Sequence, residues 1–218
     1  MKINYQDRMQ RIIDTLDGMK PSLLLHVCCA PCTSSVLERL FDNFDVTCFF
    51  DNPNITSFLE YEKRERELHT FLSKVHEYNA IEVVTTPFNP RMFYKAVKGF
   101  EREREGGARC TECFTLRLQN TATYAKANQF DFFTTTLSVS PHKSADTLNQ
   151  LGYMFQEKMD VSFLPSDFKK KNGYLRSIEL CREYGIYRQN YCGCSFSEME
   201  RIASQPSQLL SQPNQPSL

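Results

Sequence analysis

The chain has 218 residues, of which 41% are hydrophobic and 24% charged, a composition that suits a folded protein with one core. Lys plus Arg and Asp plus Glu both number 26, so the net charge is zero and no overall field draws the chain to nucleic acid. The N-terminal segment is charged throughout and no stretch approaches the roughly 18 apolar residues that span a bilayer. These features argue against a signal peptide and a membrane segment, and they predict a cytoplasmic protein.

Short apolar runs alternate with helical patterns along the chain. The predicted strands are residues 22–27, 46–50, 81–85 and 130–137. The patterns between them include a long charged helix through residues 61–68 and a helix over residues 116–127. This alternation favours an α/β fold with a parallel sheet covered on both faces, in which ligands bind at the carboxyl ends of the strands.

The C-terminal end differs in composition from the rest. Residues 205–218 are rich in Gln, Pro and Ser, which predicts a disordered tail. We therefore expect a single catalytic α/β domain over residues 1–204.

Nine cysteines need an explanation, because an intracellular compartment keeps thiols reduced and disfavours a disulfide framework. One group of cysteines follows the first strand (Cys28, Cys29 and Cys32), and a C-x-x-C motif supplies two more (Cys110 and Cys113). Together they offer enough thiolates for a four-cysteine iron–sulfur or zinc site. Their position at a strand end favours chemistry over a structural zinc site. The loop must turn for adjacent Cys28 and Cys29 to bind together; otherwise Cys32 replaces one of them.

The remaining cysteines fall into two kinds. Cys192 and Cys194 are separated by one Gly, a spacing that allows either an easily reduced disulfide or two more metal ligands. Cys48 lies in an apolar strand and Cys181 in a helical pattern, so both are predicted to be buried packing residues.

One basic segment is the best candidate for RNA contact. It joins cations that can hold phosphates to an aromatic that can stack on a base: Lys169, Lys170, Lys171, Tyr174 and Arg176. The alternative is a solvated lysine loop.

Other polar residues support weaker predictions. The mixed-sign runs 63–67 and 101–105 are expected to be exposed helix faces. His142 and Lys143 follow the fourth strand in a polar loop, which suits binding an anion or donating a proton, or simply capping a helix.

Several segments together resemble a known family. The strings LLLHVCCAPC, FFDNPNI, RCTECFTLRL, TTTLSVSPHKS and LPSDFKKKNGYLRSIELCREYGIYRQNYCGCSFS resemble, in this order and over most of residues 22–197, the cobalamin-independent epoxyqueuosine reductases. The resemblance implies a Rossmann-like fold akin to nucleotide alpha-hydrolase domains, with a helical C-terminal part. It also implies the last step of queuosine synthesis, in which the epoxide of epoxyqueuosine in transfer RNA becomes an alkene at the expense of an unidentified electron donor.

The resemblance further implies a set of site residues. A [4Fe-4S] cluster is implied to be held by Cys28, Cys29, Cys110 and Cys113, and Cys192 and Cys194 are implied to form a redox-active disulfide. An adjacent mononuclear iron is a further expectation, with Cys32 or Asp51 as candidate ligands. Asp51 is accordingly expected among the catalytic residues.

Two other functions compete with this one. An ATP-dependent transfer RNA thiolase or ligase of the same broad fold would carry an SGGxDS loop after the first strand, but this position reads CCAPCTSS. A zinc-stabilised RNA-binding module without enzyme activity is the second alternative, and visible iron–sulfur absorbance would distinguish it.

Overall fold

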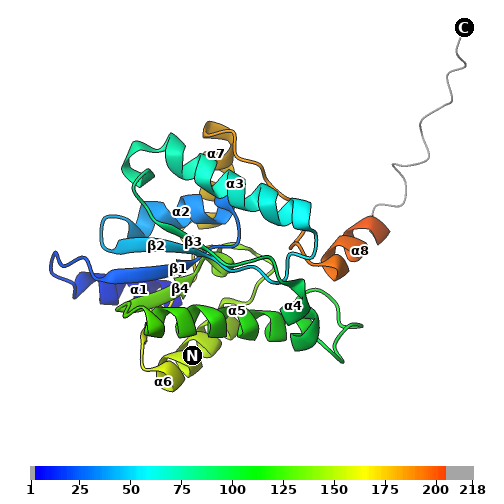
Figure 1. Ribbon diagram of the computed structural model, residues 1–218. Coiled ribbons are helices and arrows are strands. Elements are labelled where there is room, and N and C mark those ends of the chain that lie inside the picture. Colours follow the sequence, from blue (N-terminus) through cyan, green and yellow to red (C-terminus); the bar gives the residue numbers. More distant parts are fainter. Residues whose placement is uncertain (1–2, 205–218) are drawn as a thin grey trace, which may run out of the picture.

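A five-stranded parallel sheet lies between two layers of helices in the computed structural model, which describes residues 3–204 (Figure 1). The strands are β1 (Ser22–His26), β2 (Asp45–Phe50), β3 (Val83–Thr85), β4 (Phe132–Thr135) and β5 (Ser162–Phe163). The helices are α1 (Tyr5–Asp14), α2 (Ala30–Leu40), α3 (Phe58–Lys74), α4 (Pro90–Ala96), α5 (Ala108–Ala127), α6 (Ala145–Met159), α7 (Gly173–Glu183) and α8 (Ser195–Ala203), with short 3-10 helices η1 (His76–Tyr78) and η2 (Thr136–Val139). The tail predicted over residues 205–218 lies outside the described residues.

The sheet has the strand order β3-β2-β1-β4-β5, and every pairing is parallel. This confirms the predicted α/β class and a strand in each of the four predicted segments. The last strand was predicted too long, because residues 136–137 belong to the 3-10 helix η2. The two residues of β5 did not stand out in the sequence, because so short a strand has no periodicity of its own.

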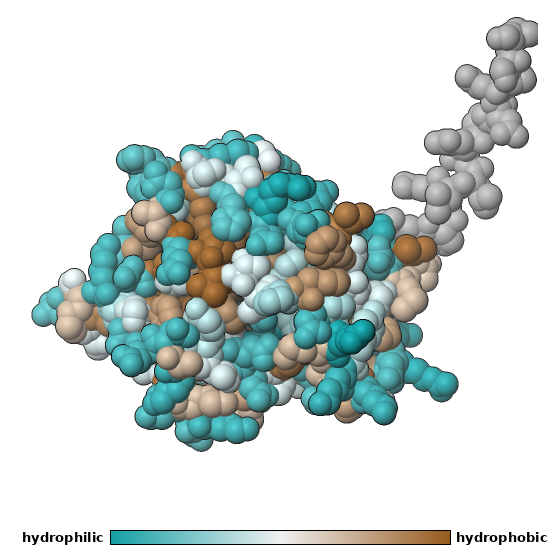
Figure 2. Space-filling view, viewed as in Figure 1, coloured by the Kyte–Doolittle hydropathy of each residue, from teal (hydrophilic) through white to brown (hydrophobic). Residues whose placement is uncertain are grey.

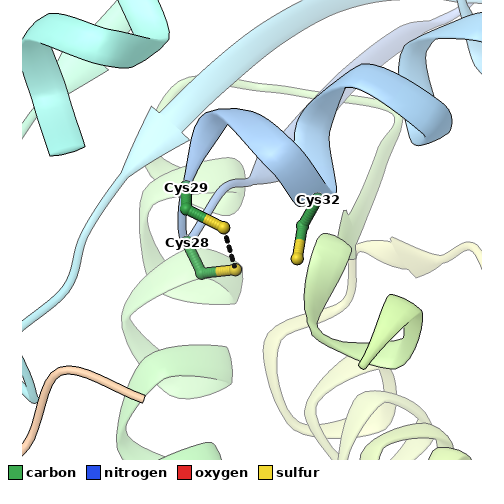
Figure 3. A group of neighbouring side chains, drawn as sticks. All are labelled: Cys28, Cys29 and Cys32. Atoms are coloured by element: carbon green, nitrogen blue, oxygen red, sulfur yellow. Dashed lines mark hydrogen bonds between the residues drawn. The ribbon is translucent and has the colours of Figure 1, made fainter. Parts of the chain in front are cut away.

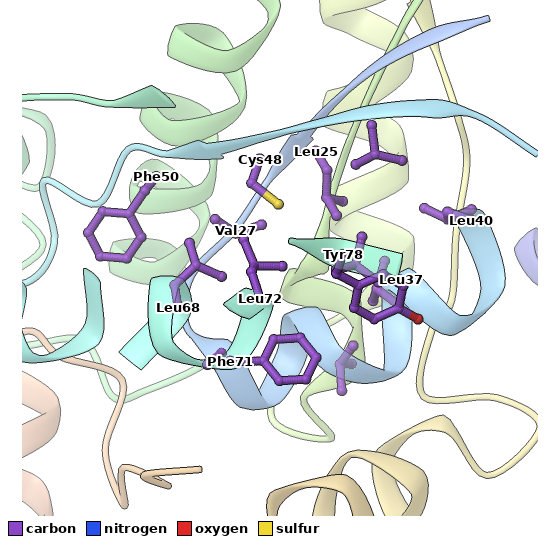
Figure 4. Close-up of a cluster of buried hydrophobic side chains, with 14 of the residues drawn as sticks. Leu25, Val27, Leu37, Leu40, Cys48, Phe50, Leu68, Phe71, Leu72 and Tyr78 are labelled. Carbon is purple, nitrogen blue, oxygen red and sulfur yellow. The ribbon is translucent and has the colours of Figure 1, made fainter. Parts of the chain in front are cut away.

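Alternation along β1 explains the two cores. Leu23 and Leu25 belong to the core under α2 and α3, whereas Leu24 belongs to the core under α5 and α6. All three side chains are fully buried, as expected for a central strand covered on both faces. Figure 4 shows the first core, in which side chains from β1, β2, α2 and α3 interlock. The sheet is therefore a rigid base for the loops at its carboxyl edge.

Side-chain caps fix where the covering helices begin. The hydroxyl of Ser57 accepts a hydrogen bond from the backbone N–H of Glu60 at the start of α3, and Ser144 accepts one from Thr147 at the start of α6. Because each cap directly follows a loop at the carboxyl side of the sheet, these helices start beside the candidate site.

The outer surface is mostly hydrophilic. In the face shown in Figure 2, hydrophobic side chains come to the surface in the middle, where Figure 1 shows the edge of the sheet, and beside α8. Within residues 3–204, no helix has the length and apolar character that a membrane crossing requires.

Replacing Cys48 by Ser is expected to lower the free energy of unfolding by about 1–3 kcal/mol, because an unpaired hydroxyl would enter the apolar core. Cys48 is fully buried on β2, and burial raises the pKa of its thiol to about 12. Urea denaturation measures the change. Cys48→Ala is the control for lost volume alone, and a Ser variant no less stable than the Ala variant would contradict the apolar environment.

Candidate metal and redox site

The candidate site lies where β1 and β4 end side by side. From β1 the chain continues through β2 to β3 on one side of the sheet, whereas β4 and β5 lie on the other. Such a switch point leaves a crevice at the carboxyl ends of the strands. The backbone N–H of Cys28, after β1, donates to the hydroxyl of Thr136, after β4, at 3.3 Å. This hydrogen bond fixes the two segments to each other.

Cys28, Cys29 and Cys32 bring their sulfur atoms together at the start of α2 (Figure 3). The three Sγ atoms lie within 4.8 Å of one another, and those of Cys28 and Cys29 are 3.6 Å apart. Cys29 is the extended residue before α2, which places Cys32 in its first turn. Two sulfur ligands of one tetrahedral ion, with bonds of about 2.3 Å, lie about 3.8 Å apart. The group can therefore hold a metal, and the turn that adjacent cysteines require is present.

The pKa values of these three thiols shift in opposite directions. Hydrogen bonds from Cys29 and Cys32 lower the pKa of Cys28 well below its usual value, and Lys143 and Arg117 add to this stabilisation. The hydrogen bond between Cys29 and Cys28 is the main cause that raises the pKa of Cys29 to about 12. The pKa of Cys32 is raised in the same way, by its hydrogen bonds to Cys28 and Cys29. A bound metal cation would reverse the two upward shifts, because coordination favours deprotonated sulfur.

A buried network beside the thiols is built around Arg117 of α5. Arg117 is 1% exposed, and its Nη2 donates to Oδ1 of Asn52 at 2.6 Å. Its Nε lies 3.3 Å from Nε2 of His26, whose Nδ1 is 2.7 Å from the hydroxyl of Thr135. Burial and the charge of Arg117 lower the pKa of His26 to about 3, so the imidazole is neutral. His26 thus serves to position the arginine rather than to carry charge.

Asp51 does not join the thiols. Its Oδ1 accepts a hydrogen bond from the hydroxyl of Thr86, and its Oδ2 accepts one from Asn120, both at 2.8 Å. The carboxylate borders a different, open cavity together with these two partners. Its assignment as a catalytic residue or metal ligand stays a prediction.

Four further cysteines line one small cavity of about 20 Å³, here called the inner cavity: Cys110, Cys113, Cys192 and Cys194. The first two lie in the opening turns of α5, and the other two precede or cap α8. Burial raises the pKa of Cys113 and of Cys194 to about 12, and all four are free thiols. The structure thus gathers the C-x-x-C with the C-terminal pair.

Arg64 of α3 holds the C-terminal pair in place. This arginine is 2% exposed, and its Nε contacts the carboxylate of Glu60 at 2.7 Å. Its Nη1 donates to the carbonyl of Cys192 at 3.0 Å and its Nη2 to the carbonyl of Tyr191 at 3.3 Å. Sequence positions 128 residues apart are joined by these contacts.

Gly193 allows this close approach. Its φ is 112°, and a Cβ atom there would lie 3.0 Å from Ile55 and 3.1 Å from Nη1 of Arg64. The carbonyl of Gly193 accepts a hydrogen bond from the backbone N–H of Thr56 at 3.1 Å. A residue with a side chain would therefore push the segment away from α3.

A larger cavity of about 430 Å³, here called the outer cavity, opens beside the thiols. Cys28, Cys32 and Cys192 border it, as do Tyr174 and Arg188, whose guanidinium lies 5.2 Å from the tyrosine ring centroid. The volume falls in the range of small-molecule sites, and a paired aromatic and arginine suit stacking on a planar base.

The predicted RNA-binding segment reaches this cavity through Tyr174. The backbone N–H of Lys169 donates to the carbonyl of Ser138 at 3.2 Å, and Arg39 donates to the carbonyl of Lys170 at 2.8 Å. These bonds anchor the segment to the loop after β4 and to α2.

Some of the predicted cations are already paired. Arg176 contacts Glu38 at 2.7 Å, and Lys169 contacts Asp167 at 2.8 Å. Lys170 and Lys171 are exposed, and no salt bridge within residues 3–204 includes either. RNA contact by this segment stays a prediction.

Sequence reasoning missed the arginine of α3. The run 63–67 was expected to be an exposed face, which is wrong for Arg64. Tyr61, Arg64 and Leu68 are spaced three and four residues apart and are all buried, so a cation in an apolar stripe was the available signal. The run 101–105 is exposed as expected, but it lies between α4 and α5 and is no helix.

Comparison with known proteins identifies related chains. The family model described as epoxyqueuosine reductase QueH matches residues 23–200. Epoxyqueuosine reductase QueH of Streptococcus pyogenes serotype M1 is 42% identical over 200 residues, which cover 90% of this chain and 78% of the relative. The same-named protein of Staphylococcus epidermidis is 40% identical over 206 residues, with 92% and 87% covered. That of Thermotoga maritima is 38% identical over 186 residues, with 83% and 92% covered.

Gly193→Ala is expected to expose Cys192, because the new methyl group would displace the segment from Arg64. The measurement is the alkylation rate of Cys192 in reduced protein, followed by mass spectrometry, and the rate should rise. Gly99→Ala is the control, since Gly99 also has a positive φ of 91° but nothing lies within 4 Å of its added Cβ. Equal alkylation rates in the two variants would show that the contact with Arg64 does not set the position of the segment.

Proposed function

The chain belongs to the epoxyqueuosine reductase QueH family, and from this membership we propose that it converts epoxyqueuosine in transfer RNA to queuosine, the last step of queuosine synthesis. The match over residues 23–200 is the observation that carries the proposal. The cysteine-lined crevice at the switch point of the sheet supports it, because reduction needs a site for electrons beside a site for substrate. Because the chain belongs to a family of reductases, the alternative function as a zinc-stabilised RNA-binding module without enzyme activity is not retained.

The reaction removes the epoxide oxygen as water and forms an alkene, which consumes two electrons and two protons. We assign the outer cavity to the modified nucleoside, since its volume of about 430 Å³ and its Tyr174–Arg188 pair suit a planar base. A base presented there from transfer RNA would leave its helical stack, as enzymes that act on a single base require. Its epoxide would then lie near the sulfur atoms of Cys28, Cys32 and Cys192.

We propose that the cofactor is a [4Fe-4S] cluster, with one ligand pair at the end of β1 and the other in α5: Cys28, Cys29, Cys110 and Cys113. The sulfur atoms of Cys28 and Cys29 lie 3.6 Å apart, which supports the first ligand pair, and thiolates are the usual iron–sulfur ligands. A bound cluster supplies single electrons. The protein itself contributes Arg117 and Arg64, whose buried charges favour the thiolate forms.

A second metal is part of the proposal. Cys32 lies within 4.8 Å of Cys28 and Cys29, so it is the better placed candidate for a mononuclear iron beside the cluster. Asp51 remains the other candidate, although its carboxylate now bonds to Thr86 and Asn120. The ligand, whether Cys32 or Asp51, would hold a metal ion that polarises the epoxide oxygen.

We further propose that Cys192 and Cys194 cycle between dithiol and disulfide. Both border the inner cavity, and the backbone N–H of Ser197 donates to Sγ of Cys194 at 3.4 Å at the start of α8. This hydrogen bond works to lower the pKa of Cys194, but burial outweighs it and the net shift is upward, so Cys194 is the thiol partner of the pair when it is reduced. The electron donor for this pair is a partner that we leave unnamed.

Transfer RNA is the proposed macromolecular partner, and the cytoplasm is the proposed place of action. Lys170 and Lys171 are exposed beside Tyr174, so phosphates near the modified base would contact them. Arg176 takes part less directly, because Glu38 already neutralises it.

Anaerobically reconstituted protein is expected to convert epoxyqueuosine in transfer RNA to queuosine when dithionite and a viologen supply electrons. Nuclease digestion followed by mass spectrometry measures the product. Cys110→Ser and Cys113→Ser should lose iron, sulfide and activity together, because each removes a ligand of the cluster. Cys48→Ala is the matched control and should keep all three. Full iron and sulfide in the two Ser variants, or loss of sulfide in Cys32→Ser, would contradict the ligand set of the cluster.

Replacing Lys170 and Lys171 together by Ala is expected to weaken transfer RNA binding and to reduce the slope of log affinity against log salt by up to about 2, roughly one per lost phosphate contact. Filter binding across salt concentrations measures this. The charge-matched control replaces Lys126 and Lys158, which lie at the ends of α5 and α6 opposite the site. An unchanged slope in the first variant would return the segment to a solvated loop.

A further inference from the structure

Lys143 lies at the junction of the two cavities. It belongs to the loop between η2 and α6. The helix η2 directly follows β4, so this loop lies at the carboxyl end of that strand. Four residues border both cavities: Glu105, His142, Lys143 and Cys192. A ligand that fills the outer cavity and extends toward the inner thiols therefore meets the side chain of Lys143.

The charge of Lys143 is not neutralised by a carboxylate. None of the salt bridges within residues 3–204 includes it. Burial works to lower the pKa of Lys143, but its interactions with the nearby sulfur groups of Cys192, Cys28 and Cys32 outweigh burial and the net shift is upward. The ammonium group is therefore cationic at neutral pH, and it borders both cavities together with Cys192.

Two buried cations near the thiols are committed to protein groups. Arg64 contacts Glu60 and two backbone carbonyls, and Arg117 donates to Asn52 at 2.6 Å. Both are at most 2% exposed, so neither is free to turn toward a ligand. Lys143 is partly exposed, and its side chain forms no salt bridge with any of residues 3–204.

We propose that the ammonium group of Lys143 binds the epoxide oxygen of the substrate and stabilises the negative charge that develops there as a C–O bond breaks. This inference rests on the proposed function. A donor that is already in place where charge develops stabilises the transition state more than the ground state. The position at the junction is where an oxygen on a side chain extending from the outer cavity would lie.

The step balances without any electrons from Lys143. A low-potential one-electron donor supplies two electrons, both epoxide C–O bonds break, and the electron pair becomes the new C=C π bond. The oxygen takes up two protons from solvent and leaves as water. Lys143 contributes a charge and a hydrogen bond, and it is unchanged when the product leaves.

Lys143→Met is expected to lower kcat by about 100-fold, the effect typical of a lost oxyanion donor, while KM for transfer RNA changes little. Iron and sulfide content and the affinity for transfer RNA are measured on the same samples and should equal those of wild type. Lys126→Met is the control, because Lys126 pairs with Asp160 on the surface away from the site. Lys143→Arg should keep more activity than Lys143→Met, since it retains a cation.

Chemical rescue separates this role from a structural one. Methylamine should restore part of the rate of Lys143→Ala and none of the rate of Cys110→Ser, because only the first lacks an ammonium group. Undiminished kcat in Lys143→Met would overturn the inference. An effect confined to KM would also overturn it and would point to a phosphate contact, whereas a loss of iron would overturn it and point to a structural role. A wild-type enzyme unable to reduce epoxyqueuosine would overturn the proposed function, and this inference with it.

Discussion

A negative charge on buried sulfur is stable only where fixed positive charge or hydrogen-bond donors surround it, and this constraint shapes the protein around its thiols. Transfer of an isolated ion from water to a protein interior costs several kcal/mol or more. Cys28 is 8% exposed, and the cations near its group come from three elements: Arg64 from α3, Arg117 from α5 and Lys143 from the loop after β4. The two arginines are buried in turn, so each has its own set of protein partners.

The order of the strands explains why cysteines far apart in the sequence meet. Because β1 and β4 are neighbours, the loop that carries Cys28 and the loop that carries Lys143 leave the sheet at the same place. The start of α5 brings its C-x-x-C to that edge, and the chain after α7 returns there to deliver Cys192. Hydrogen bonds from Arg64 and Thr56 fix the segment that carries Cys192, so that it forms one wall of the site.

Much of this arrangement was predictable from local patterns. The four strands and the packing roles of Cys48 and Cys181 follow from short sequence signals, whereas the sequence left open whether the chain turns at Cys28 and Cys29. The burial of Arg64 was signalled only by its place in the apolar stripe of α3, and its carbonyl partner 128 residues away could not be predicted from any local pattern. Asp51 shows the opposite case: it follows β2 at the right edge of the sheet, but Thr86 and Asn120 hold its carboxylate in another cavity. Strand ends locate a site, whereas long-range partners decide which side chains enter it.

The late position of Cys192 and Cys194 affects the order of events during translation. The sheet is complete at Phe163, yet the inner cavity gains its last wall only when the segment before α8 has left the ribosome and docked on Arg64. Until then the thiols of the growing chain lie open to oxidants and to stray metals. A chain truncated before Tyr191 would therefore fold around an inner cavity that lacks the wall formed by Cys192 and Cys194.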